Sequence, residues 1–196
     1  MHSSITPSKL EVVKTRPDGL ARPLDYFYTQ SGLELPEFRV LTGAEVPQPF
    51  RRLLVHLNDM TPTLEEFYGD EIELQVLRRR RRGLEYWREV VLRLRATGQP
   101  VEFGANRLRL DRFPVAARKA ILEERAPLGH IMRDFGIEHR CQPNAFLELK
   151  ADEFIGATLG LSGPSEVYGR HNRLYGPGGS WLSEVVEILG PPVRSA

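Results

Sequence analysis

The sequence has one cysteine, no long apolar run and almost no excess of charge of one sign. A single cysteine, Cys141, excludes an internal disulfide and any site built from several cysteines, which suits a reducing compartment. No stretch reaches the ~20 apolar residues that a membrane span needs, and the first residues lack the apolar block of a signal peptide. We therefore expect a cytoplasmic protein that contacts no membrane.

Charge and motifs exclude further classes of function. With 27 basic and 26 acidic residues the net charge is +1, which argues against broad binding to nucleic acid. The five histidines are scattered, and neither an HExxH, a CxxC nor a phosphate-loop pattern occurs. We expect neither a bound metal nor a bound cofactor. The protein is expected to be a monomer or a weak homo-oligomer, with a small molecule as its partner.

The chain divides into two parts by composition. Residues 1–45 are rich in Pro, Ser, Thr and Gly without a sustained period, which predicts an N-terminal extension that is partly ordered at best. Residues 46–196 form the expected compact domain. It begins with two helices, the second opened by a capping box of Thr63 and Glu66 and ended by Gly69.

From residue 71 onward, apolar residues recur mainly with period two. Strands are expected in EIELQVLR, EYWREVVLRLR, PVEFGANRLRL, AFLELK, EVYGRHNRLYG and SWLSEVVEILG, with helices in PVAARKAILEER and PLGHIMRDFG. The run from Arg78 to Arg82 is expected at the tip of the first hairpin, before Gly83. Six or so strands with hairpin-length links predict an α+β domain on a mostly antiparallel sheet.

One arginine stands where an apolar side chain is expected. In EYWREVVLRLR, Arg88 shares its strand face with Tyr86, Val90, Leu92 and Leu94, while the other face carries Glu89, Arg93 and Arg95. A guanidinium that faces a core without a partner costs several kcal/mol. It must therefore pair with an internal carboxylate or await an anionic ligand, and the pattern alone leaves both open.

The last strand holds the complementary anomaly. In SWLSEVVEILG, Glu184 alternates with one set of apolar residues and Glu187 with the other, so either register places one glutamate in apolar surroundings. A sheet edge or an ion pair with Arg88 explains this structurally. A dry pocket that holds one arginine and one carboxylate explains it functionally.

Four strings in this order are similar to the chorismate pyruvate-lyase family, in its divergent branch. They are NDMT at 58–61, YWREVVL at 86–92, FGANRLRLDRFPVAARKAILEERAPLG at 103–129 and YGRHNRLYGPGGSWLSEVVEIL at 168–189. The resemblance spans about residues 50 to 192. It implies a six-stranded antiparallel sheet with helices that close over an internal ligand pocket. It also implies elimination of pyruvate from chorismate, without a cofactor, to give 4-hydroxybenzoate.

The resemblance also implies roles for individual residues. The family's ligand-binding methionine falls on Met60, and the arginine that grips the substrate carboxylate falls on Arg88. A backbone amide donor falls on Leu128. The glutamate that contacts the ring hydroxyl falls on Glu187, with Glu184 as the second choice. Arg88 and Glu187 would be the catalytic pair.

One departure from the family pattern bears on activity. Some members carry an arginine near the pyruvyl end of the site where this chain has Ala105. That contact is either missing or supplied by Arg107 on the same strand face. Arg170 and Arg173 are further candidates for the enolpyruvyl carboxylate, and they lie on opposite faces of their strand. The alternative function is a non-catalytic module that binds an aromatic acid, because related folds serve as effector-sensing domains of bacterial regulators. A third possibility is lyase chemistry on another enolpyruvyl acid.

Overall fold

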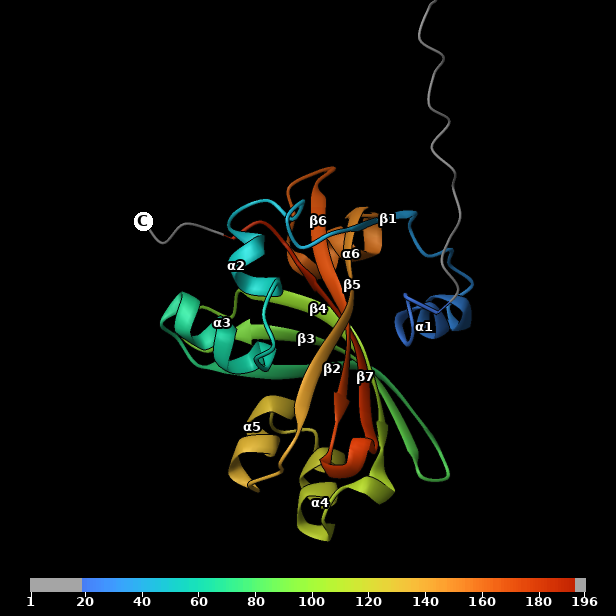
Figure 1. The fold of residues 1–196 in the computed structure, drawn as a ribbon. Coiled ribbons are helices and arrows are strands. Elements are labelled where there is room, and N and C mark those ends of the chain that lie inside the picture. The colour runs from blue at the N-terminus through green and yellow to red at the C-terminus, as the bar shows by residue number, and fades with distance from the viewer. Residues whose placement is uncertain (1–18, 193–196) are drawn as a thin grey trace, which may run out of the picture.

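In the computed structural model, which describes residues 19–192, one antiparallel sheet of seven strands forms the centre of the molecule (Figure 1). Its order is β1-β5-β6-β7-β4-β3-β2. The strands are β1 (Phe38–Leu41), β2 (Ile72–Arg82), β3 (Glu85–Leu94), β4 (Pro100–Arg109), β5 (Arg140–Lys150), β6 (Glu166–Tyr175) and β7 (Trp181–Leu189). The predicted α+β class with an antiparallel sheet is confirmed. The seventh strand is β1, which sequence periodicity did not indicate.

Helices cover both faces of the sheet. They are α1 (Leu24–Gln30), α2 (Phe50–Leu54), α3 (Met60–Tyr68), α4 (Val115–Glu123), α5 (Leu128–Asp134) and α6 (Glu153–Leu159), and two short 3-10 turns follow β4 and β6. Helices α1 and α6 pack with Val91, Phe103 and Val186 on one face. Helices α2 to α5 pack on the other, and Figure 1 shows α1 on the opposite side of the sheet from α3 and α5. We call these the α1/α6 face and the α3/α5 face.

The N-terminal segment differs from the expected extension. Helix α1 buries Leu24, Phe27 and Tyr28 against the sheet, and β1 pairs with β5. Residues 24–41 are therefore part of the domain, and the boundary expected at residue 46 does not hold for them. A seven-residue helix and a four-residue strand are too short to show a period. Residues 1–18 of the expected extension lie outside the described residues.

The arginine run is part of a strand and not a hairpin tip. Strand β2 continues to Arg82, and Gly83, with φ of 60°, makes the turn. Arg78 forms a two-fold contact with Glu89 at 2.6 Å for each bond, and its guanidinium lies over the rings of Phe27 and Phe154 at 5.6 and 5.3 Å. Glu89, which the alternation placed on the polar side, is thus fully buried beneath α1. Both faces of β3 belong to cores.

The start of α3 brings the chain over the α3/α5 face. Asp59, and not Thr63, occupies the N-cap position, so that Met60 and Thr61 form the first turn. Thr63 instead donates from its hydroxyl to the carbonyl of Asp59 at 2.8 Å. A Cβ on Gly129 would lie 2.9 Å from Thr61 Oγ1, so the first turns of α3 and α5 are in contact. Within the described residues, no helix is long and apolar enough to cross a membrane.

Candidate functional site

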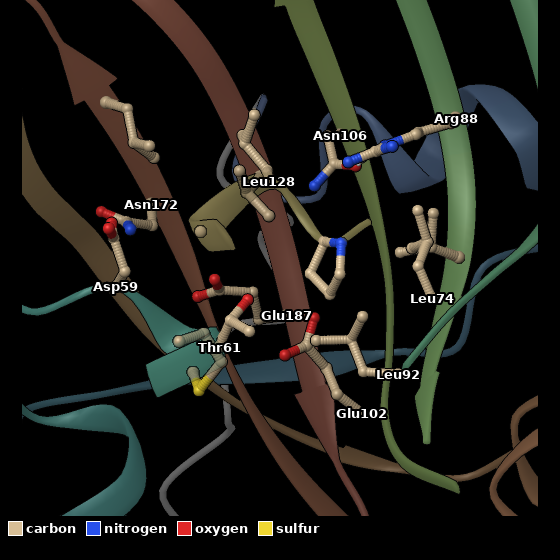
Figure 2. A pocket seen from close by; sticks show the side chains of 16 residues that line it. Asp59, Thr61, Leu74, Arg88, Leu92, Glu102, Asn106, Leu128, Asn172 and Glu187 are labelled. Carbon is tan, nitrogen blue, oxygen red and sulfur yellow. Dashed lines mark hydrogen bonds between the residues drawn. The ribbon is translucent and has the colours of Figure 1, made fainter. Parts of the chain in front are cut away.

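A cavity lies between the α3/α5 face and the first turns of α3 and α5 (Figure 2). It encloses about 50 Å³, which is room for a few water molecules and less than the roughly 300–1,000 Å³ of typical small-molecule sites. A larger ligand therefore requires its walls to move apart. Four strands and two helix starts contribute most of its wall. The lining residues are Asp59, Met60, Thr61, Leu74, Arg88, Val90, Leu92, Glu102, Asn106, Pro127, Leu128, Gly129, Asn172, Leu174, Val185 and Glu187.

Arg88 is buried at one end of this cavity without an ionic partner. Its side chain is 1% exposed, and its Nε donates to Asn106 Oδ1 at 2.9 Å. Its Nη1 is buried and has no hydrogen-bond partner among the described residues. Burial lowers the pKa of the guanidinium, although an arginine stays protonated in proteins. Of the two alternatives that the sequence left open, the structure therefore favours an arginine that awaits an anion.

The internal ion pair exists but uses a different arginine. Arg170 donates from Nε to Glu187 Oε2, and both side chains are buried. Its two Nη atoms donate to the carbonyls of Leu54, His56 and Asn58 at 3.2 to 3.3 Å. Burial opposes the charge on Arg170, but pairing with Glu187 raises its pKa above the ordinary value. Arg170 thus fixes Glu187 and also anchors the segment that leads into α3.

Two glycines flank Glu187 across the sheet. Gly104 on β4 is opposite Glu187, and Gly169 on β6 is opposite the next residue, Ile188. A Cβ on Gly104 would overlap the carbonyl oxygen of Val186, and one on Gly169 would overlap that of Glu187. The neighbouring strands therefore approach β7 more closely than any side chain would permit. This close packing fixes the position of the β7 backbone at Glu187, whose side chain lines the cavity.

Glu102 is a second carboxyl group in the cavity, and sequence reasoning missed it. It is 4% exposed, and its Oε2 has no partner among the residues described. Burial, reinforced by the nearby charge of Glu187, raises its pKa well above the ordinary value, which favours the neutral acid. In PVEFGAN, Glu102 alternates with Gly104 and Asn106, so no apolar period marked its face as buried. Figure 2 shows Glu102 and Glu187 close together, away from Arg88 and Asn106.

The remaining expected cavity residues come from the two helix starts. Met60 in the first turn of α3 and Leu128 in the first turn of α5 both line the cavity. The first amides of a helix have no acceptor within the helix, so the Leu128 amide is a donor for a ligand. Asn172 adds a buried Oδ1 that has no partner in the described part of the chain. The structure thus gathers Met60, Arg88, Leu128 and Glu187 around one space.

Arg107 and Arg173 do not line this cavity, contrary to expectation, and neither does Glu184, the second choice for the cavity glutamate. Their side chains lie on the α1/α6 face, because they alternate with the cavity residues along β4, β6 and β7. Arg107 donates to Glu85 at 2.6 Å, and Arg173 donates to Glu184 at 2.7 Å. Burial would raise the pKa of Glu184, but its contacts with His171 and Arg173 hold it below the ordinary value.

Ala105 also faces away from the cavity. It is fully buried in the core of the α1/α6 face. An arginine at this position would therefore not reach the cavity in this fold, and Arg107, on the same strand face, does not replace it. The described residues supply one unpaired cation to the cavity, Arg88, whereas chorismate carries two carboxylates.

The polar groups divide the cavity into two ends. Arg88 and Asn106 form a basic end with an unused donor, while Glu102 and Glu187 form an acidic end. Between them the walls are mostly apolar, from Leu74, Leu92 and other aliphatic residues. This arrangement of polar groups matches a partly apolar molecule with an anionic group at one side and a hydrogen-bond donor at the other.

Solved structures of low sequence identity share this fold. PhnF from Mycobacterium smegmatis matches with a TM-score of 0.54 at 15% identity, over 70% of this chain and 66% of that one. The effector domain of PhnF matches with a TM-score of 0.51 at 14% identity, over 70% of this chain and 95% of that one. The ligand-binding domain of a protein described as a GntR-family transcriptional regulator, from Bordetella bronchiseptica, gives 0.48 at 17% identity, over 65% and 92%. The chain thus spans slightly less than two thirds of PhnF.

Searches against protein-family models and curated proteins find no match. The prediction of an enzyme is contradicted by these matches, because a solved structure that the chain resembles with a TM-score above 0.5 is an effector domain, that of PhnF. The expected α+β fold itself is unaffected, because related folds were expected both in lyases and in effector-sensing domains. The chain has the fold of the PhnF effector domain.

Proposed function

We propose that this chain is a cytoplasmic, non-catalytic effector-binding module that takes a small organic anion into the cavity beneath α3 and α5. The observation that carries the proposal is Arg88, a buried cation with an unused Nη1 at the wall of a cavity. The ligand class is an aromatic acid with a hydroxyl group, of which 4-hydroxybenzoate is the simplest example.

The energetics of Arg88 favour binding of an anion. Without a ligand, the protein bears the cost of a buried guanidinium that only Asn106 contacts through a side-chain bond. A carboxylate at this site makes a charge-assisted bond of about 1.5–3 kcal/mol and also supplies the missing countercharge. Occupancy therefore relieves a cost that the empty fold carries.

The two carboxyl groups at the acidic end would orient the bound ligand. Glu187 is held by Arg170, and Glu102, as a neutral acid, has both a donor and an acceptor to offer. A ligand hydroxyl near these two groups can donate to one and accept from the other. A second carboxylate there would meet the Glu187 charge without an unpaired cation. The ligand is thus a monoanion with a polar, uncharged far end.

The test is calorimetric titration of the purified chain with 4-hydroxybenzoate. Benzoate, which lacks the hydroxyl, and 4-hydroxybenzyl alcohol, which lacks the carboxylate, serve as comparison ligands. We expect the alcohol to bind at least about 10-fold more weakly than the acid, because it cannot pair with Arg88. Benzoate is expected to lose less, about 5-fold, because a single hydrogen bond to a hydroxyl contributes about 1 kcal/mol.

Two arginine variants make the test specific. Arg88→Gln removes the cation from the cavity, and Arg173→Gln removes one from the α1/α6 face. Binding should fall at least 10-fold in the first and stay unchanged in the second. Equal affinities of wild type and Arg88→Gln for every ligand would refute the proposal. Chorismate incubated with the protein should be recovered unchanged, and release of pyruvate would also contradict a non-catalytic module.

A further inference from the structure

A second hollow opens on the outer side of Asp59 and contains three potential metal ligands. It has about 640 Å³ of space that solvent can enter, and its lining includes Asp59, His139 and Cys141. Their ligand atoms all lie within 4.8 Å of one another. The three residues come from the N-cap of α3, the residue before β5 and β5 itself. Sequence spacing gave no sign of this cluster, because Asp59 is 80 residues from His139.

The hydrogen bonds of His139 orient one ring nitrogen toward the cluster. The carbonyl of Ile137 can only accept, so Nδ1 carries a hydrogen and donates to it at 2.8 Å. Nε2 then donates to the carboxylate of Asp59, at 2.9 and 3.1 Å from its two oxygens, so His139 is an imidazolium ion paired with Asp59. A backbone carbonyl that holds one ring nitrogen while the other faces outward is the usual support of a metal-binding histidine.

The thiol converges on the same point. Cys141 donates from Sγ to Asp59 Oδ1 at 3.2 Å, the same oxygen that faces His139 Nε2. In a catalytic triad the acid and the nucleophile contact opposite nitrogens of the imidazole. Here the carboxylate contacts Nε2, and the other nitrogen is used by the backbone. The arrangement is therefore unsuited to a proton relay and suited to three ligands around one centre.

We propose that Asp59, His139 and Cys141 bind one divalent transition-metal ion of the zinc type, with a fourth position open to the hollow. Thiolate, imidazole and carboxylate are the three ligand types that zinc takes in proteins, at about 2.0–2.3 Å. On binding, the thiol of Cys141 and Nε2 of His139 each release any proton they carry to solvent. One carboxylate, one thiolate and a neutral imidazole then balance the double positive charge.

Two cations lie near this point, and each has a partner: the charge of Arg170 acts on Asp59 and Cys141 but is paired with Glu187. Arg140, which also lines the hollow, directs its guanidinium over the ring of Tyr175 at 4.8 Å. Glu66 lines the hollow as well, and its exposed carboxylate or a water molecule is available for the fourth position. His139 Nε2 and Cys141 Sγ each lie at hydrogen-bond distance from Asp59 Oδ1, so both need to move away from that oxygen by a few tenths of an ångström to admit an ion. The bound ion would join β5 to the start of α3.

Cobalt(II) provides a direct test, because Cys141 is the only cysteine of the chain. Titration of the untagged full chain should give one ion per molecule and a near-ultraviolet thiolate-to-cobalt charge-transfer band. Zinc should then abolish the band by displacement, and should raise the melting temperature of the protein. A wild-type chain that shows no such band and no rise with zinc would overturn the proposal, whatever the variants do.

The variants Cys141→Ser and His139→Gln test the ligands separately. We expect the first to lose the band and both to bind zinc at least about 100-fold more weakly. The matched control is His130→Gln, because His130 also pairs with a carboxylate of α3, Glu65, at 2.7 Å but lies outside the cluster. Circular dichroism checks that each variant is folded, and if one is not, the other decides. An unchanged affinity in His139→Gln, or an equal loss in His130→Gln, would contradict the site.

The metal site does not depend on the proposed effector function, since it uses the outer hollow and not Arg88. The two tests therefore fail independently. Asp59 is the only one of the three ligands that also lines the inner cavity.

Discussion

The two faces of the sheet differ in whether their buried charged side chains are paired. On the α1/α6 face each buried carboxylate that the structure describes has a partner: Glu89 pairs with Arg78, and Glu184 with His171 and Arg173. On the α3/α5 face, Arg170 and Glu187 are paired, but Arg88 and Glu102 each leave a buried polar atom without a hydrogen bond. The same strands supply both sets, at alternating positions.

The difference separates buried charges that are neutralised within the fold from one, Arg88, that has no counter-ion among the described residues. A buried ion pair with its hydrogen bonds satisfied is roughly neutral for stability, whereas an unpaired buried charge is destabilising. Removing a charge should therefore have opposite effects on the two faces. Substitutions that preserve the shape of a side chain but remove its charge measure this change in the free energy of unfolding directly.

Arg78→Met should destabilise the α1/α6 face most. It leaves Glu89, which is fully buried, without its counter-ion, although Arg78 itself is 29% exposed. We expect the free energy of unfolding to fall by about 3 kcal/mol, the lower end for breaking a buried pair. Urea unfolding followed by circular dichroism measures this change. An effect below about 1 kcal/mol would mean that the pairing on this face is dispensable.

Arg88→Met should have the opposite sign. It removes a buried cation that lacks a countercharge, at the smaller cost of leaving Asn106 Oδ1 without its donor. We expect the ligand-free protein to gain about 1–2 kcal/mol, or a rise of several degrees in melting temperature. Wild type and variant are compared by calorimetry in the absence of any anion other than chloride. A clear loss of stability would show that Arg88 is a structural residue.

Glu102→Gln should reveal a dependence on pH. The carboxyl group has a folded-state pKa raised above its ordinary value of 4.5, so the folded chain keeps a proton that the unfolded chain releases. Stability from this group is therefore present below pH 4.5 and declines as the pH rises toward the folded-state pKa. The advantage of Glu102→Gln over wild type should grow across that window. A difference that is constant from pH 4 to 8 would contradict a raised pKa.

Arg95→Gln gives the reference for an exposed charge. Arg95 is 58% exposed and contacts Glu71 and Glu73, which are themselves exposed. Such pairs contribute little, because water and salt screen them. The free energy of unfolding should change by less than about 0.5 kcal/mol. A larger loss would mean that removing an exposed charge changes stability as much as removing a buried one, so that the difference between the two faces would not be specific to burial.

The sequence predicted those parts of the fold and site that depend on local alternation. Period two placed Arg88 on the face of Val90 and Leu92, and those three residues line the cavity together. The two glutamates of β7 were expected on opposite faces, and they are: Glu187 lines the cavity and Glu184 pairs with Arg173 on the other side. A strand carries this information in its own sequence.

The burial of a side chain could not be predicted where it depends on a helix or strand that packs on it from elsewhere in the sequence. Glu89 was assigned to a polar face, because nothing in its own strand showed that α1 and an arginine from β2 would bury it. Glu102 was overlooked because its alternate neighbours, Gly104 and Asn106, are not apolar. Arg107 was expected at the ligand because it lies on the strand face of Ala105, but that face is turned away from the cavity and Arg107 contacts Glu85. In each case a partner distant in sequence decided the outcome.

The close approach of three strands at Glu187 has a consequence for the recognition of distant relatives. At 14–15% identity to PhnF and its effector domain, side chains that contact a ligand are poor landmarks, since a change of ligand would change them. Gly104 and Gly169 are constrained in a different way, because any Cβ there would strike the backbone of β7 whatever the ligand is. In this chain the two glycines are therefore fixed by the backbone itself, whichever molecule the cavity binds.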